Sequence, residues 1–222
     1  MYDAVLFHSR VAECTSRILE TVGLAPGSYG LATVHRAENT DDAERLHGLL
    51  MAFNDVARNV FPLVLPMHPR TAGVVRSALP RWSPEARLHV IQPVGYLDML
   101  CLVRHARVTL TDSGGLQKEA FFLGCPCVTL RDETEWTETV RGAGNIVAGV
   151  KPMDIIAAVL TWESRLSGGM ANFAAAAGAS FGNGRAADRI VQALLAAPPG
   201  DANAWSASCE TTAIKPTGDG RC

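Results

Sequence analysis

The sequence lacks a pronounced excess of charge of either sign. It contains 20 lysines and arginines against 22 aspartates and glutamates, which gives a formal net charge of -2. Nucleic acids and acidic membranes are bound through clustered positive charge, and this balance offers no such surplus. We therefore expect neither nucleic acid nor a membrane among the partners of the protein.

Long apolar runs are also missing. No stretch of the sequence approaches the roughly 20 apolar residues of a membrane span. The first residues carry neither the basic segment nor the small-residue cleavage site of a secretory signal. The six cysteines are scattered, which is typical of a reduced cytosolic protein and not of a disulfide framework. These absences predict a cytoplasmic protein.

Several familiar site motifs do not occur. The sequence has no Gly-x-x-x-x-Gly-Lys phosphate loop, no His-x-x-Glu-His metal pattern and no serine nucleophile elbow. Cys125 and Cys127 form the closest cysteine pair, but without a second Cys or His pair they are a poor zinc signal. Residues 182–187 imitate a dinucleotide fingerprint, yet no predicted strand precedes them, so we expect a helix start there. No metal site is expected.

What the sequence does contain is an alternation of apolar runs and helical patterns. Near-continuous apolar strands separated by helices are typical of a parallel sheet covered on both faces. We therefore predict an α/β fold with a doubly wound, Rossmann-like parallel sheet of about six strands. The predicted strands are residues 29–34, 63–67, 88–92, 107–111, 127–130 and 145–147. The predicted helices are residues 1–22, 41–59, 71–79, 96–105, 116–123, 135–141, 152–166 and 184–195.

The two ends of the chain differ from this middle part. Residues 1–28 read as a helix followed by a loop with Pro26 and Gly27. Residues 198–222 are rich in Pro, Gly, Ser, Thr and Ala and have almost no apolar periodicity, so we predict a disordered tail. The sheet domain is therefore expected over residues 29–197.

The stretch Thr-Asp-Ser-Gly-Gly-Leu-Gln-Lys-Glu, residues 111–119, joins a predicted strand to a predicted helix. The free N–H groups of such a helix start, with the helix dipole, attract an anion. Gly114 and Gly115 would let a phosphate approach the backbone without meeting a Cβ atom. Glu119, one turn further, would then accept hydrogen bonds from a neighbouring group such as ribose hydroxyls. The alternative is a plain helix start with Ser113 as N-cap, and this stretch does not separate the two.

Polar groups follow several of the other predicted strands. Ligands of doubly wound sheets bind beyond the carboxyl ends of the strands, so these groups should face one crevice. Arginines there would suit a negatively charged ligand. The alternative is that each arginine pairs with a surface carboxylate such as Glu38, Asp132 or Glu133. The residues concerned are His35, Arg36, His68, Arg70 and Arg131.

Four runs of the sequence strongly resemble the non-hydrolysing UDP-N-acetylglucosamine 2-epimerases. They are TVHRAENTDD (33–42), PMHPRT (66–71), TDSGGLQKEA (111–120) and RDETEWTETV (131–140), and GNGRAADRI (182–190) resembles the closing helix of that family. The resemblance implies the C-terminal half of a two-domain GT-B-type fold, with UDP bound mainly by this half. It implies elimination of UDP from UDP-GlcNAc and its re-addition after the C2 proton returns on the other face, giving UDP-ManNAc. No nicotinamide cofactor or catalytic metal is implied.

The same resemblance assigns roles to individual residues. Residues 113–115 would bind the diphosphate and Glu119 the ribose. The backbone around Val94 and the side chain of Met99 would border the uracil. His35 would reach the phosphate and sugar region and is the catalytic candidate. The remaining residues of the expected UDP site are Arg36, His68, Arg131 and Trp136.

The sequence departs from the family at several points. It shows no counterpart of the N-terminal domain, which supplies the carboxylates thought to move the C2 proton, and residues 1–28 resemble the interdomain segment. Lys118 stands where many members have Glu, and Trp136 where some have a ligand-binding Arg. The Thr-Glu-Trp form at residues 134–136 resembles members that act on UDP-linked diacetamido-uronic acids. We therefore expect this chain alone to be inactive or nearly so, with the missing domain or a second copy as its partner.

Three functions remain open at this point. They are an epimerase, acting on UDP-GlcNAc or on a UDP-diacetamido-uronic acid; a UDP-binding module without turnover; and half of a glycosyltransferase. Turnover by the chain alone would exclude the second, and UDP release that depends on an acceptor would favour the third. A face that should pack on a missing domain also predicts poor solubility or self-association.

Overall fold

The computed structural model describes residues 1–168 and 174–196, which fall into two compact units. The first unit runs from Met1 to Gly184 and contains the sheet and its flanking helices. The second begins at Arg185, and its described helix is α11 (Ala186–Ala196), at the position of the predicted 184–195 helix. The tail predicted at residues 198–222 lies outside the described residues.

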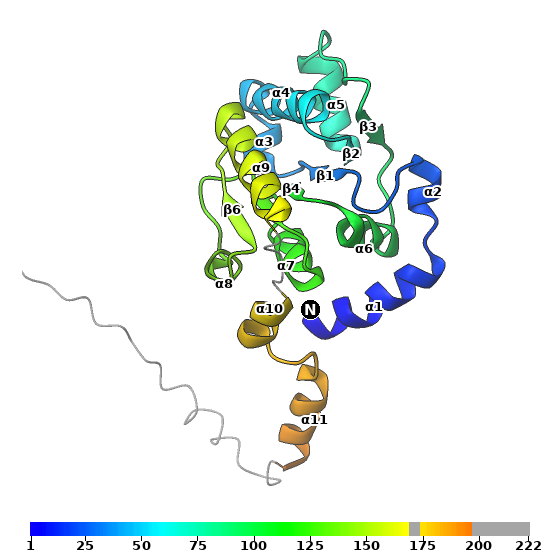
Figure 1. Cartoon of the computed structure of the whole chain (residues 1–222), viewed down its shortest axis with the longest axis vertical. Helices are drawn as coiled ribbons and strands as arrows, with labels where there is room; N and C mark the ends of the chain where they lie inside the picture. The colour runs from blue at the N-terminus through cyan, green and yellow to red at the C-terminus, as the bar shows by residue number, and fades with distance from the viewer. Residues whose placement is uncertain (169–173, 197–222) are drawn as a thin grey trace, which may run out of the picture. The chain divides into compact units, whose positions relative to one another are not determined.

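A six-stranded parallel sheet forms the centre of the first unit (Figure 1). Its strands are β1 (Gly30–Thr33), β2 (Leu63–Pro66), β3 (Leu88–Ile91), β4 (Thr109–Thr111), β5 (Cys127–Thr129) and β6 (Asn145–Val147). Their order across the sheet is β3-β2-β1-β4-β5-β6. The chain thus starts at the middle, runs to one edge, returns beside β1 and continues to the other edge. This order confirms the predicted doubly wound, Rossmann-like fold and places its switch point between β1 and β4.

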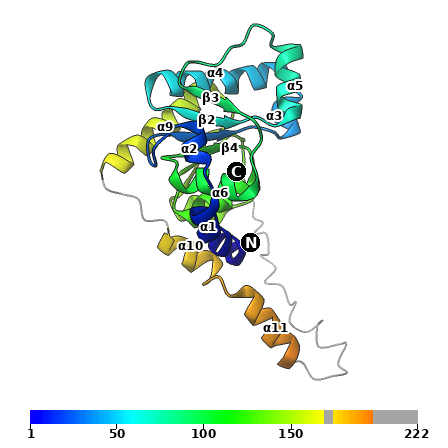
Figure 2. The same cartoon turned by 90° about the vertical axis from the view of Figure 1, so that its right-hand side faces the viewer.

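Helices cover both faces of the sheet. Helix α4 contacts β2 and β3 on one face, and α7 contacts β4 and β5 on the other, as Figure 2 shows for the layers as a whole. The helices of the first unit are α1 (Tyr2–Thr15), α2 (Ile18–Val22), α3 (Ala37–Thr40), α4 (Ala43–Asn59), α5 (Pro69–Ala78), α6 (Tyr96–His105), α7 (Gly114–Leu123), α8 (Thr137–Arg141), α9 (Pro152–Ser167) and α10 (Ala174–Phe181). Because both faces are covered, the strands can be apolar along their whole length, which is the pattern that predicted them.

Tyr29 and Trp162 are large buried side chains whose polar groups form hydrogen bonds between the helices and the sheet region. The Tyr29 hydroxyl donates a hydrogen bond to the carbonyl of Leu102 in α6 at 2.8 Å. The Trp162 indole N–H in α9 donates to the carbonyl of Cys127 in β5 at 3.0 Å. Each aromatic ring therefore fills the core while its polar group is satisfied.

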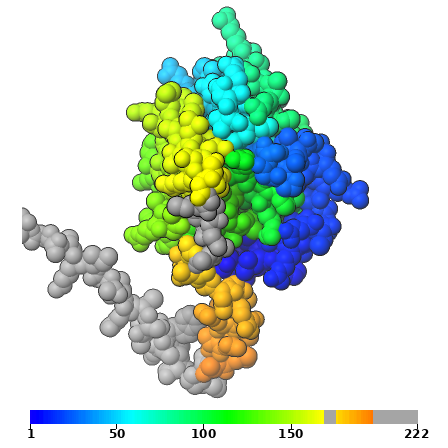
Figure 3. Space-filling model, viewed as in Figure 1, coloured from blue at the N-terminus to red at the C-terminus, as the bar shows by residue number. Residues whose placement is uncertain are grey.

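The predicted single helix over residues 1–22 is wrong, because it is two helices, α1 and α2. Ser16, between them, is extended, with φ of -75° and ψ of 135°. Its hydroxyl donates to the Asp98 carboxylate at 2.6 Å and accepts from the Ile18 N–H at 3.3 Å. The break is thus stabilised by a residue of α6 that lies far along the chain. Figure 3 shows this blue segment against the green flank that α6 and α7 form.

The described helices include none that is both long and apolar enough to cross a membrane. The cysteines described, Cys14, Cys101, Cys125 and Cys127, are all free thiols. Burial raises the pKa of Cys125 to about 12, and burial also raises the pKa of Cys127. These two thiols are therefore protonated packing groups, in agreement with the structural reading of the pair.

Candidate functional site

The ends of β1 and β4 form the centre of the candidate site. The parallel register places Thr33 of β1 opposite Thr111 of β4, and their hydroxyls share a hydrogen bond of 2.7 Å. His35 and Arg36 follow β1 by a few residues, and Ser113 follows β4. The switch point therefore brings together residues that are separated by almost eighty positions in the sequence.

Helix α7 begins at Gly114, two residues earlier than predicted. Ser113 is its N-cap, since its hydroxyl accepts from the Leu116 N–H at 3.4 Å. The plain helix-start interpretation is therefore correct as local structure. The same helix start also offers donors to an anion, because among the described residues the N–H groups of Gly114 and Gly115 have no hydrogen-bond partner.

The two glycines have different surroundings. A Cβ atom at Gly115 would meet only Ser113 Oγ at 3.7 Å and Met1 Cε at 3.8 Å, which are ordinary contacts. A Cβ atom at Gly114 would lie 3.0 Å from Trp136 Nε1 and 3.2 Å from Glu135 Oε1. Gly115 is thus open, whereas Gly114 allows residues 135 and 136 to approach the helix closely.

A pocket of about 360 Å³ lies at the ends of β1, β2, β3 and β4. Seven of the expected site residues line it, namely His35, His68, Val94, Met99, Ser113, Gly115 and Glu119. Four expected residues lie outside its lining, namely Arg36, Gly114, Arg131 and Trp136. Arg36 and Arg131 belong to a neighbouring network of ion pairs around Glu135, and Gly114 lies beside Glu135. A larger hollow of about 530 Å³ between α4 and residues 78–85 contains none of the expected site residues.

Asp112 ties the two strand ends together, and the sequence interpretation missed it. Its carboxylate is fully buried and accepts from the N–H groups of His35, at 3.0 Å, and Arg36, at 2.9 Å. The Asn39 amide donates to the same oxygen at 3.1 Å, and His35 Nδ1 lies 3.3 Å from the other. Since Nδ1 faces Asp112, Nε2 is the nitrogen that His35 has available for a ligand in the pocket. An acidic residue directly before Ser-Gly-Gly was the only signal in the sequence.

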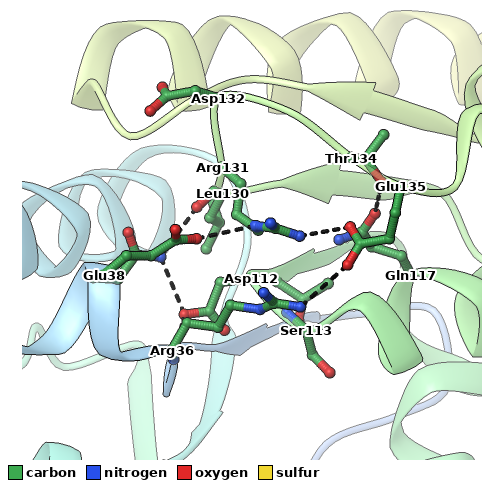
Figure 4. A network of polar contacts seen from close by, with 12 residues as sticks. Arg36, Glu38, Asp112, Ser113, Gln117, Leu130, Arg131, Asp132, Thr134 and Glu135 are labelled. Carbon is green, nitrogen blue, oxygen red and sulfur yellow. Dashed lines mark hydrogen bonds and ion pairs between the residues drawn. The ribbon is translucent and has the colours of Figure 1, made fainter.

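Arg36 and Arg131 hold the same carboxylate, as Figure 4 shows. Glu135 accepts from Arg36 at 3.3 Å and from Arg131 at 2.6 Å, and Arg131 also donates to Glu38 at 3.0 Å. The backbone N–H of Glu135, and after it the Arg131 guanidinium, hold the pKa of the Glu135 carboxyl below its usual range. Both arginines are thus ion-paired, as the alternative expected, but Glu38 is the one expected carboxylate that takes part among the described residues. Their partners are Glu38 and Glu135, while Asp132 points away from this network.

Glu119 lines the pocket and is 9% exposed. Burial raises the pKa of its carboxyl, although the hydrogen bond from Tyr96 and the charge of Lys118 act in the opposite direction. Tyr96, the first residue of α6, is a second residue that sequence reasoning did not assign to the site. A buried carboxylate with a single hydroxyl partner still has accepting capacity for a ligand.

Replacing Glu119 by glutamine should raise the free energy of unfolding at neutral pH and weaken ligand binding. A raised pKa in the folded state means that the folded protein binds more protons than the unfolded one just above the ordinary carboxyl pKa. Stability therefore falls as pH rises through the folded pKa, and Glu119→Gln removes that loss. Urea unfolding at pH values of about 4 to 7 measures it.

The matched control for this change is Glu20→Gln, at an exposed position of α2. A surface substitution of this kind should change the free energy of unfolding at neutral pH by less than about 0.5 kcal/mol. If Glu119→Gln lowers stability at neutral pH, the carboxylate is stabilised by its surroundings and the interpretation is wrong.

The described residues contain no group of three or more His, Cys, Asp or Glu side chains that could hold a metal ion. Backbone N–H groups, an imidazole and two guanidinium groups favour an anion, and the apolar lining at Val94 and Met99 favours a flat apolar group.

Comparison with known proteins gives consistent results. The family profile described as UDP-N-acetylglucosamine 2-epimerase matches residues 1–195. The UDP-2,3-diacetamido-2,3-dideoxy-D-glucuronate 2-epimerase of Pseudomonas aeruginosa is 41% identical over 195 residues, which cover 87% of this chain and 50% of that protein.

Two solved structures are also similar. The UDP-GlcNAc 2-epimerase of Methanocaldococcus jannaschii, in complex with UDP-GlcNAc and UDP, is 34% identical with a TM-score of 0.74, covering 87% of this chain and 52% of that one. The Neisseria meningitidis protein bound to UDP-GlcNAc is 26% identical with a TM-score of 0.69, covering 87% and 53%. The predicted α/β fold, half of a GT-B-type fold, is confirmed. The chain spans about half the length of the curated relatives it matches.

Proposed function

Because the chain belongs to the UDP-N-acetylglucosamine 2-epimerase family, we propose that it binds the UDP part of a UDP-2-acetamido sugar and serves its 2-epimerisation. One observation carries this proposal: residues from four strand ends line one pocket beside the unpaired N–H groups at the start of α7. In this arrangement residues 113–115 bind the diphosphate and Glu119 binds the ribose. Val94 and Met99 border the uracil.

The geometry suits the departure and return of UDP. Negative charge develops on the diphosphate when its bond to C1 of the sugar breaks, and donors fixed at that place stabilise it. The N–H groups of Gly114 and Gly115 are such donors, and Arg36 lies beside them. His35, oriented by Asp112, is the residue we propose to donate a proton to, or accept one from, the phosphate and sugar region.

The movement of the C2 proton needs further acid–base groups, which we propose lie in the half of the relatives that this chain does not span. The protein is then an epimerase polypeptide whose chain alone has little or no turnover. The sugar is GlcNAc or a diacetamido-uronic acid, since relatives of both kinds are similar. A UDP-binding module without turnover is the second candidate, favoured by the same half-length match. A cytoplasmic location and a role in polysaccharide biosynthesis belong to this proposal.

Binding of UDP is the first test. At a concentration 100 times its dissociation constant, UDP should stabilise the folded chain by about 2.7 kcal/mol, which corresponds to a rise in Tm of about 5–10 °C. Calorimetry should give one site, and CDP at the same concentration should act much more weakly because the pocket is proposed to border uracil. A chain that is folded but unaffected by UDP would contradict the proposal.

An activity assay then separates the two candidate functions. The chain is mixed with the N-terminal domain of a homologous epimerase, and interconversion of UDP-GlcNAc and UDP-ManNAc, or of the diacetamido-uronic pair, is followed. Restored turnover supports the epimerase. UDP binding without turnover on any of these sugars supports the module.

A further inference from the structure

Lys118 is held in an unusual position for a lysine beside an anion site. Its ammonium lies 3.4 Å from the centre of the Trp136 ring. Among the described residues no carboxylate lies within ion-pair distance of it, whereas Arg36, Arg45 and Arg131 all have acidic partners. Lys118 is therefore a cation that is positioned by an aromatic face and has no direct ion pair, although its charge also acts on the nearby Glu119 carboxyl.

Hydrogen bonds from the core hold the backbone of Trp136, the residue whose ring contacts Lys118. Gln117 is fully buried, and its side-chain carbonyl accepts from the Thr134 hydroxyl at 2.6 Å (Figure 4). The Thr134 hydroxyl in turn accepts from the backbone N–H of Trp136 at 3.1 Å. The indole Nε1 is buried without a partner among the described residues, and it faces Gly114. A buried donor without a partner is costly, so a ligand or water near Gly114 is expected to use it.

The placement of Lys118 points to the sugar end of the ligand. Val94, Met99 and Glu119 line the pocket on the nucleoside side, and Gly115 is open to it. Trp136 lies outside that lining, beside Gly114. With the nucleoside placed at Val94 and Met99, we assign the Gly114 side to the sugar end of the diphosphate. Lys118 follows Gly114 by one helical turn, and helical side chains lean toward the helix N-terminus. The ammonium is thus directed toward the same end.

We propose that Lys118, held on the Trp136 ring, binds the carboxylate of a uronic-acid sugar, which makes UDP-linked uronic acids the substrate class of this site. This inference rests on the proposed function. The diphosphate already has the N–H groups of α7 and Arg36, and a neutral sugar would offer the ammonium no counter-charge. A carboxylate would give it a charge-assisted hydrogen bond, the stronger kind in proteins.

The test uses three probes: UDP, UDP-glucose and UDP-glucuronic acid. The two sugar nucleotides differ only at C6, so the ratio of their dissociation constants isolates the carboxylate. By calorimetry we expect the purified chain to bind UDP-glucuronic acid about 5–10-fold more tightly than UDP-glucose, an effect of the size of one ion pair. The ratio should decrease as salt is added.

The variants are chosen to separate charge from packing. Lys118→Gln keeps a good helix former and should bring the ratio to about one while UDP affinity changes less than about twofold. Lys118→Arg should keep the preference. Lys151→Gln removes a lysine charge at an exposed position before α9 and should leave the ratio unchanged.

Each other outcome overturns the proposal. UDP bound without any preference for UDP-glucuronic acid would show that Lys118 does not bind the carboxylate. Equal weakening of all three probes in Lys118→Gln would assign the ammonium to a phosphate instead. Failure of the unmodified chain to bind UDP at all would overturn the proposed function itself. This outcome is distinguished from failure of the Lys118 proposal because it is seen with UDP alone, before any variant is tested.

Discussion

Replacing Gly115 by valine should weaken UDP binding by about 100-fold or more, because charge-assisted backbone hydrogen bonds are worth about 1.5–3 kcal/mol each. The N–H groups of Gly114 and Gly115 have no partner among the described residues, and a diphosphate must come close to the backbone to use them. A branched side chain at residue 115 would occupy that space. Calorimetry with UDP measures the effect.

The fold should survive this change. A Cβ atom at Gly115 meets nothing closer than 3.7 Å, and the residue has ordinary helical geometry. Circular dichroism and the Tm of the variant without ligand should therefore match those of the unmodified chain. A loss of binding can then be assigned to the blocked backbone and not to unfolding.

Gly73→Ala is the matched control for Gly115→Val. Gly73 lies in α5, away from the pocket lining, and a Cβ atom there has no neighbour within 4 Å. This change should leave UDP affinity unchanged and raise stability by about 0.5–1 kcal/mol, since alanine is the better helix former. If Gly115→Val folds and binds UDP as tightly as the unmodified chain, the diphosphate does not bind at the start of α7.

Replacing Asp112 by asparagine should lower the free energy of unfolding by about 2–4 kcal/mol, the usual cost of leaving buried donors without their charged acceptor. The carboxylate accepts from two backbone N–H groups and the Asn39 amide, and it is fully buried. An asparagine offers one accepting oxygen, and its own NH2 group would face other donors. Urea unfolding measures the loss.

The same variant should also bind UDP more weakly under conditions where it remains folded. His35 and Arg36 are positioned through their own N–H groups, so a shift of the Asp112 side chain moves both. Asp41→Asn is the control, because Asp41 pairs with Arg70 at the surface and such pairs contribute about 0–1 kcal/mol. Equal effects of Asp112→Asn and Asp41→Asn would mean that Asp112 does not hold the strand ends.

The parts of the fold that the sequence predicted are those set by local patterns. Helix α6 and strand β6 have the predicted bounds, since an apolar stripe or a short apolar run between turn residues defines each of them. The end of α1 at Ser16 could not be predicted from a local pattern. It depends on Asp98, whose proximity to Ser16 exists only in the folded chain.

The site residues show the same difference between local motifs, which the sequence reveals, and contacts that exist only in the folded chain. The motif residues His35, Ser113, Gly115 and Glu119 were predicted, and the structure places them in one pocket. The contribution of Asp112 was missed because its partners come from the end of another strand. The pairing of Arg131 with both Glu38 and Glu135 was not specific in the sequence either, since several nearby carboxylates were equally available.

In the structure, the Glu135 carboxylate is the anion that pairs with both arginines beside the site. This carboxylate lies close to Gly114 and pairs with Arg36 and Arg131, and Arg36 lies beside the place that we propose for the diphosphate. If a phosphate bound Arg36, the Arg36–Glu135 ion pair would break and an Arg36–phosphate ion pair would form. The free energy gained would be the difference between these two ion pairs. Because salt screens both pairs, that exchange would also be less sensitive to ionic strength than binding to a free arginine.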